Sequence, residues 1–93
     1  MPYVERPCQW ARVPKPRKSA FSPEYEEIIR RLIARRMALG MTQVQLAAAY
    51  GEDQSFVSRI ERRQRRLDVW EFTRWCHILD ITPGTILAGL GAA

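Results

Sequence analysis

The stretch MTQVQLAAAYGEDQSFVSRIE, residues 41–61, predicts two short helices joined by a tight turn. Thr42 is a favourable N-cap, and Gln45 three residues later completes the pattern of a capping box. Gly51 is placed to end the first helix, because glycine adopts the left-handed conformation after a last turn at the lowest cost. Asp53 then supplies the N-cap of the second helix. These signals together predict a helix–turn–helix.

The two predicted helices each have an apolar face, but the second also has a distinct polar face. The apolar residues recur at helical spacing and are expected to face the core: Leu46, Ala47 and Tyr50, then Phe56, Val57 and Ile60. The other side of the second helix carries Gln54, Ser55, Ser58 and Arg59. A helix that turns such hydrogen-bonding groups outward is suited to contact a polar ligand.

The segments TQVQLA and QSFVSRIE, with Gly51 between them, resemble the phage-repressor type of helix-turn-helix, the Cro/CI or XRE family of regulators. The resemblance extends from about residue 23 to residue 90. It implies an all-α, five-helix phage-repressor-like domain with a central helix-turn-helix. It also implies sequence-specific binding of double-stranded DNA to regulate transcription, most simply as a repressor that binds a palindromic operator as a homodimer.

The resemblance assigns contacts to DNA along both motif helices. Gln54, Ser55, Ser58 and Arg59 are the expected base contacts; a glutamine can form two hydrogen bonds with adenine, and an arginine can do so with guanine. The expected phosphate contacts are Thr42, Gln43, Arg62, Arg63, Gln64, Arg65 and Arg66. The alternative is that these polar side chains only face solvent.

Two further expectations concern the ends of the second motif helix. The family pattern implies a structural ion pair between Arg36 and Glu61. Members often have glycine where this chain has Arg63, so either Arg63 adopts a left-handed conformation or the helix continues for another turn.

The first helix is expected to begin with Ser22 as N-cap and Pro23 in the first turn, and to stop at Gly40. Its apolar face should contain Tyr25, Ile28, Ile29, Leu32 and Leu39. Most of its arginines, among them Arg30, Arg31 and Arg35, are interpreted as a solvated face.

Two more capped helices are predicted in the C-terminal part. Asp68 and Glu71 form the pattern of a capping box, and Thr82 followed by Pro83 marks the start of the last helix. Leu67, Val69, Phe72, Cys76, Leu79 and Ile81 are expected to face the core.

The tryptophans of this part, Trp70 and Trp75, exceed what one helix face can bury and indicate an interface. The alternative is a tryptophan that is partly buried in the core, which is common. The family that the chain resembles commonly dimerises at this end, so the resemblance implies a homodimer contact made by Trp70, Trp75, Ile86, Leu87 and Leu90. An alternative function is the antitoxin of a toxin–antitoxin pair, which would autoregulate its operon and bind a toxin. A motif that binds only protein and no DNA is a further alternative, which the arginine-rich segment disfavours.

The chain has 93 residues and a formal net charge of +5. Its cations concentrate in residues 1–22 and 51–67, whereas residues 68–93 carry more acidic than basic side chains. Residues 1–20 contain four prolines and no periodic pattern, so we expect a basic N-terminal arm followed by one DNA-binding domain over residues 21–93. Lys15, Arg17 and Lys18 are candidates for DNA contacts, with a solvated linker as the alternative.

The composition also argues against several functional classes. No apolar run approaches the roughly 20 residues of a membrane span, and no apolar signal segment is evident, so we expect a cytoplasmic, nucleoid-associated protein. Cys8 and Cys76 lack metal-ligand spacing, and His77 is the single histidine. With no catalytic set of residues in view, we expect no enzyme activity, cofactor or metal.

Overall fold

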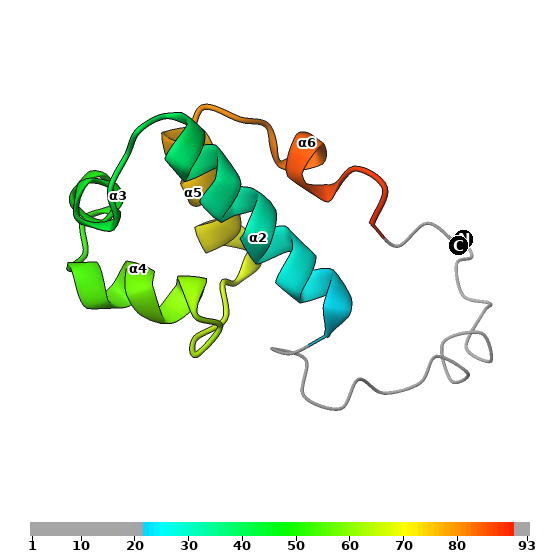
Figure 1. The fold of residues 1–93 in the computed structure, drawn as a ribbon, viewed down its shortest axis with the longest axis horizontal. Coiled ribbons are helices and arrows are strands. Elements are labelled where there is room, and N and C mark those ends of the chain that lie inside the picture. Colours follow the sequence, from blue (N-terminus) through cyan, green and yellow to red (C-terminus); the bar gives the residue numbers. More distant parts are fainter. Residues whose placement is uncertain (1–21, 91–93) are drawn as a thin grey trace, which may run out of the picture.

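The computed structural model describes residues 22–90. Within this part of the chain it contains helices and no strand, which confirms the expected all-α class. The helices are α2 (Pro23–Ala38), α3 (Gln43–Tyr50), α4 (Gln54–Glu61), α5 (Val69–Ile78) and α6 (Pro83–Leu87). In Figure 1, α3 and α4 lie on one side of the long helix α2, and α6 lies on the other.

Local side-chain chemistry starts every one of these helices, as predicted. Each N-cap side chain accepts a hydrogen bond from a backbone N–H of the first turn, and two of the caps are complete capping boxes. The five caps are Ser22, Thr42, Asp53, Asp68 and Thr82. Gly51 ends α3 with a φ of 96°, a left-handed value that glycine adopts without steric cost.

The core forms where α3 and α4 pack against α2 and α5. It consists of Ile29, Leu32, Leu46, Ala47, Tyr50, Phe56, Val57, Ile60, Trp75, Cys76, Leu79 and Ile86. At its centre the rings of Tyr50, Phe56 and Trp75 lie with centroids 5.2–6.1 Å apart in tilted pairs, a favourable arrangement for aromatic rings. Ala47 is fully buried, as expected from its place on the apolar face of the first motif helix.

Two predictions of core residues are wrong at helix ends. Leu39, placed on the inner face of α2, is the C-cap residue and 42% exposed. Val69, placed on the inner face of α5, is the first residue of that helix and 82% exposed. Helical periodicity does not predict burial at such positions, because the chain changes direction there.

The interface prediction for the C-terminal helices is wrong in part. Trp75 is 1% exposed and Ile86 is 2% exposed, so both belong to the core of the domain. Trp70 and Leu87, in contrast, are 68% and 41% exposed. The adjacent Cys76 is fully buried, and burial raises the pKa of its thiol to about 11, so the thiol stays protonated at neutral pH.

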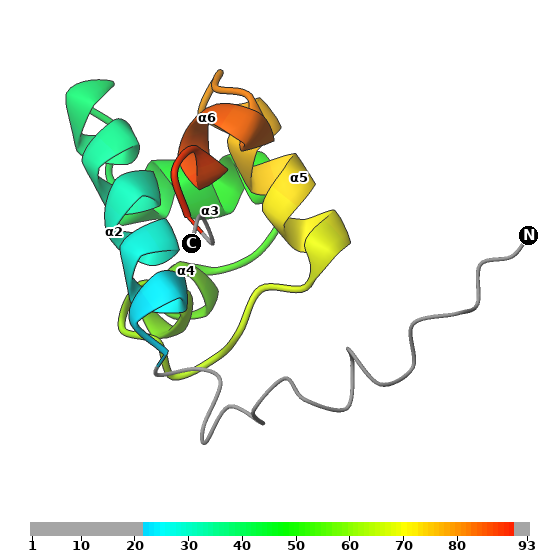
Figure 2. The same ribbon diagram turned by 90° about the vertical axis from the view of Figure 1, so that its right-hand side faces the viewer.

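The interpretation of Arg31 and Arg35 as part of a solvated face is also wrong. Arg31 donates from Nη1 to the carbonyl oxygens of Ile86 and Ala88, both at 2.7 Å. Arg35 donates to the carbonyl oxygens of Leu79 and Asp80, at 2.8 and 2.9 Å. Carbonyl groups at helix C-termini lack partners within their helix and attract cations, so these arginines fasten the ends of α5 and α6 to α2. Figure 2 shows α6 between α2 and α5.

Candidate nucleic-acid interface

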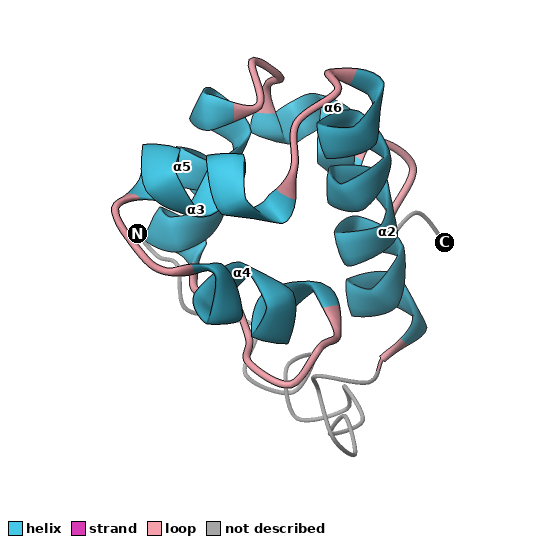
Figure 3. Cartoon of the chain, turned by 60° about the vertical axis from the view of Figure 1, so that its left-hand side comes forward, coloured by secondary structure: helices cyan, strands magenta, loops and turns pink. Residues whose placement is uncertain are grey.

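Helix α4 is fixed to the core by one face and carries an outward-facing set of polar side chains on the other. Phe56, Val57 and Ile60 are buried, whereas Gln54, Ser55 and Arg59 are exposed and Ser58 is half-buried. Figure 3 shows α4 at the lower edge of the molecule with α3 above it. The arrangement leaves the N-terminal part of α4 accessible to a large ligand.

The N-cap of α4 also involves one of the predicted base contacts. Ser55 donates its hydroxyl to Asp53 Oδ1 at 2.8 Å, and the Phe56 N–H donates to the same oxygen at 3.1 Å. These two hydrogen bonds hold the pKa of Asp53 below its usual value. The Ser55 hydroxyl therefore stabilises the start of the helix in the free protein.

Gln54, at the start of α4, is hydrogen-bonded to the start of α3. Its Nε2 donates to Oε1 of Gln43 at 3.1 Å, and Nε2 of Gln43 donates to Oε1 of Glu61 at 2.8 Å. Gln43 is thus half-buried and bonded on both sides, which the sequence did not predict. The sequence suggested only a residue placed for a phosphate contact.

The ion pair between Arg36 and Glu61 is present and largely enclosed. Arg36 donates from Nε and Nη2 to the two carboxylate oxygens of Glu61, at 2.7 and 3.1 Å. A third hydrogen bond, from Nη1 to the carbonyl oxygen of Met41, is 2.7 Å long. The two side chains are 12% and 8% exposed, so α2 is fastened to the end of α4 by a paired, desolvated charge.

The arginine-rich segment after α4 begins with a left-handed turn. Helix α4 ends at Glu61, and Arg63 has a φ of 61°. Of the two alternatives that the sequence left open, the structure therefore selects the left-handed residue. The backbone N–H of Arg63 donates to Ile60 and that of Gln64 to Arg59, which satisfies the last carbonyl groups of the helix.

The arginines of this segment do not all face outward. Arg65 donates two hydrogen bonds to the carboxylate of Glu71, at 3.1 and 3.0 Å, and its guanidinium lies 4.8 Å from the centroid of the Phe56 ring. The hydrogen bonds from Arg65 hold the pKa of Glu71 below its usual value. Nη2 of Arg63 lies 3.4 Å from Oε2 of Glu26 in α2, which makes an ion pair. Both side chains connect the segment to the domain.

The remaining polar side chains of the segment, those of Arg62, Gln64 and Arg66, are exposed. No hydrogen bond or ion pair within residues 22–90 engages the Arg62 side chain. The sequence did not distinguish Arg62 from Arg63 and Arg65. Glu26, the partner of Arg63, lies far away along the chain, and Glu71, the partner of Arg65, was expected only to complete a capping box.

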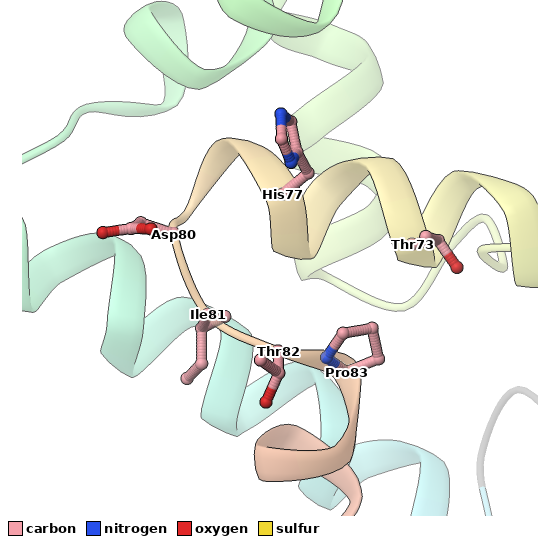
Figure 4. Close-up of a pocket in the computed structure, with 6 residues that line it drawn as sticks. All are labelled: Thr73, His77, Asp80, Ile81, Thr82 and Pro83. Atoms are coloured by element: carbon pink, nitrogen blue, oxygen red, sulfur yellow. The ribbon is translucent and has the colours of Figure 1, made fainter.

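A cavity of about 330 Å³ lies between α5 and α6, but Thr73, His77 and Asp80 at its edge point in different directions (Figure 4). Residues 22–90 contain no group of three or more side chains able to hold a metal ion. None of the helices in this part has both the length and the apolar character needed to cross a membrane. The candidate arm contacts Lys15, Arg17 and Lys18 lie outside the described residues.

Comparisons with known proteins agree with this geometry. The profile of the Helix-turn-helix family matches residues 32–86, more than half of the chain, so the chain belongs to that family. A solved structure, the XRE-family like protein from Pseudomonas syringae pv. tomato str. DC3000, superposes with a TM-score of 0.70 at 39% sequence identity. The match covers 76% of this chain and 87% of that one. A search of curated proteins gave no match.

The fold, the outward-facing polar side of α4 and these matches define a DNA-binding protein of the helix-turn-helix class. Within this class the chain is a member of the XRE family of transcription regulators. Proteins of this family are DNA-binding regulators and not enzymes.

Proposed function

We propose that the protein represses transcription by binding a palindromic DNA operator as a homodimer, with α4 in the major groove. The observation that carries the proposal is that α4 has one buried and one exposed face. Its apolar face is buried in the core, and Gln54, Ser55 and Arg59 lie on its exposed face. A helix held in this way can present side chains to base edges without losing its position in the fold.

The base contacts in this proposal are Gln54, Ser55, Ser58 and Arg59. The phosphate contacts are made first by the N-terminus of α3, where Thr42 and Gln43 are placed beside free backbone N–H groups that favour an anion. Arg62, Gln64 and Arg66 continue this surface beyond α4. Arg63 and Arg65 instead hold the segment in place, since their guanidinium groups pair with Glu26 and Glu71.

The proposed dimer contact is the exposed apolar surface of α5 and α6, consisting of Val69, Trp70 and Leu87. Their exposed fractions of 82%, 68% and 41% make them available to a second copy. Leu90 is half-buried and can contribute at the edge, whereas Trp75 and Ile86 cannot contribute because they are buried within one domain. A two-fold dimer would place two α4 helices against successive major-groove half-sites about one helical turn apart.

The antitoxin function would use the same exposed tryptophan to bind a toxin. Association of the purified protein with itself, measured by sedimentation, favours the homodimer. A protein that stays monomeric until a toxin is added favours the antitoxin.

Replacing the first base-contact residue tests the proposed function. We expect wild-type protein to bind DNA from upstream of its own gene more tightly than random duplex, with affinity falling as salt rises. Gln54→Ala should lose most of this preference, because one bidentate base contact contributes about 1–3 kcal/mol of discrimination. Sequence-specific binding would be contradicted if wild-type protein bound every duplex equally weakly and Gln54→Ala bound them with the same affinity.

The arginines after α4 are expected to divide into two groups in the same assay. Arg62→Ala should reduce the magnitude of the slope of log affinity against log salt by about 0.9, because one phosphate is no longer neutralised. Arg65→Ala is the matched control: it should leave the slope nearly unchanged and lower the thermal midpoint instead, since its guanidinium pairs with Glu71 and covers Phe56. The opposite pattern would show that Arg65 leaves Glu71 to contact the phosphate backbone.

A further inference from the structure

A groove with apolar borders lies between α5 and α6. Thr73, His77 and Pro83 line the cavity of about 330 Å³ between the two helices, and Figure 4 shows Thr73 on α5 across from Pro83 at the start of α6. Val69 lies one turn before Thr73 on the same side of α5. Leu87 lies one turn after Pro83 on the same side of α6. We call this surface the α5–α6 groove; it consists of Val69, Trp70, Thr73, His77, Pro83 and Leu87.

The large apolar side chains of the α5–α6 groove are exposed in the part of the chain that the structure describes. Val69, Trp70 and Leu87 are 82%, 68% and 41% exposed. Single exposed apolar residues are ordinary, but several of them gathered beside a cavity indicate a site of contact. The groove is therefore a surface that another segment or another molecule is expected to cover.

The two ends of the α5–α6 groove are acidic. Asp68 precedes the groove as the N-cap of α5, and Asp80 lines the cavity beyond the other end of this helix. Both side chains are exposed. Residues 68–93 contain three acidic side chains and one basic side chain, that of Arg74. An occupant that combines apolar side chains with positive charge is complementary to such a groove.

Residues 3–13, YVERPCQWARV, have this composition, and we call them the arm segment. The segment places Trp10 between Arg6 and Arg12. Residues 1–22, to which it belongs, carry five basic side chains and one acidic side chain. Burial of a tryptophan removes a large apolar area from water, so Trp10 is the side chain of the segment that gains most from a contact with the groove.

The chain enters the described domain beside one end of the α5–α6 groove. Ser22 caps α2, and Tyr25 in the first turn accepts a hydrogen bond at its Oη from the backbone N–H of Leu67, 3.1 Å away. Leu67 lies two residues before Val69. Twelve residues separate Ser22 from Trp10, and such a length spans up to about 40 Å when extended, whereas α5 is only about 15 Å long. Trp10 of the same chain can thus reach the whole groove, at the roughly millimolar effective concentration that a short tether provides.

We propose that the arm segment of the same chain occupies the α5–α6 groove of the monomer, with Trp10 against Val69 and Trp70. The consequence for assembly rests on the proposed function, because the groove contains the proposed dimer contact. A second copy then binds only after the arm segment has left, so the segment lowers the affinity of self-association.

A nitroxide spin label on Cys8 tests the position of the arm segment in the full chain. Cys8 lies two residues before Trp10. The other cysteine, Cys76, is fully buried, and burial raises the pKa of its thiol to about 11, so labelling at neutral pH is directed to Cys8. At concentrations where sedimentation shows a monomer, the backbone amide signals of Thr73 and His77 should lose most of their NMR intensity. The signals of α3 should lose little.

Two pairs of measurements test the chemistry of this contact. Trp10→Ala should restore the amide signals of the groove, because it removes the apolar anchor. Thr73→Arg should also restore them, because it places a cation in the groove opposite Arg6 and Arg12. Ala48→Arg is the matched control: it adds the same charge at an exposed position of α3 and should leave the signal loss unchanged. Melting curves confirm that each variant is folded.

A mixture of spin-labelled chains with isotope-labelled chains that carry no spin label identifies which copy supplies the segment. The monomer should show no signal loss in this mixture. Loss at the groove there would assign the segment to a second copy and overturn the proposal. Signal loss spread evenly over the exposed amides, and unchanged by Trp10→Ala, would overturn it as well.

Sedimentation tests the consequence for assembly separately. Trp10→Ala should self-associate more tightly than wild type, because the groove no longer has to be vacated. If the spin label locates the arm segment in the groove but Trp10→Ala associates as wild type does, the competition is overturned and the dimer contact lies elsewhere. Neither measurement involves DNA, so a failure of sequence-specific binding would be recognised independently.

Discussion

Arg36→Met is expected to lower the free energy of unfolding by about 3–5 kcal/mol. The substitution removes the guanidinium that pairs with Glu61 and leaves a carboxylate that is only 8% exposed without its counter-charge. It also removes the hydrogen bond to Met41 at the turn between α2 and α3. Because small domains have only about 5–15 kcal/mol of stability, the loss should be visible as a large shift of the urea midpoint followed by circular dichroism.

Arg30→Met is the matched control for this result. Arg30 also pairs with a glutamate, Glu27, but its side chain is 71% exposed. Exposed pairs contribute about 0–1 kcal/mol, so the control should hardly change the midpoint. The double substitution Arg36→Met with Glu61→Leu should recover part of the stability, because it leaves no buried charge. If Arg30→Met and Arg36→Met lowered the free energy of unfolding by similar amounts, burial of the ion pair would not determine how much it stabilises the domain.

Trp75→Ala is expected to destabilise the protein by about 3–5 kcal/mol through the cavity that it leaves. The indole is 1% exposed and lies beside the rings of Tyr50 and Phe56, with centroids 5.8 and 6.1 Å away. For a domain of this size the thermal midpoint should fall by about 12 °C or more, and differential scanning calorimetry would measure it. The effect should extend to DNA binding, since Phe56 is a core residue of α4.

Trp70→Ala supplies the comparison within the same helix. Its side chain is 68% exposed, so the stability of one domain should change by no more than about 0.5 kcal/mol. The same variant should weaken self-association in sedimentation experiments, because Trp70 is the largest side chain of the proposed dimer contact. Equal destabilisation by both substitutions, with unchanged association, would contradict the assignment of one tryptophan to the core and the other to an interface.

The two tryptophans also show where inference from sequence ends. Both lie in one helix, and the sequence suggested that one face could not bury both. Trp75 is buried because the helix-turn-helix supplies Tyr50 and Phe56 beside it. Trp70 lies in the first turn of the helix, where the neighbouring elements leave it exposed. Periodicity identifies a helix face, but the packing of other helices decides which residues that face buries.

The arginines illustrate the same limit for charged residues. Arg36 could be assigned to Glu61 from the family resemblance, whereas Arg31 and Arg35 had no visible partner in the sequence. Their partners are backbone carbonyl groups at the ends of α5 and α6, more than forty residues away along the chain. Every residue has such a carbonyl group, so no sequence pattern marks the ones that will lack a partner.

The sequence by itself determined the helices and the outward-facing residues of α4, because both depend on short-range chemistry. The five N-caps and Gly51 act within a few residues of the chain, and periodicity places Gln54 opposite Phe56 and Ile60. The tertiary structure alone decided that Arg63 and Arg65 face the protein, that Trp75 belongs to the core and that Gln54 is bonded to Gln43. These features depend on distances between elements, which arise only when the helices pack.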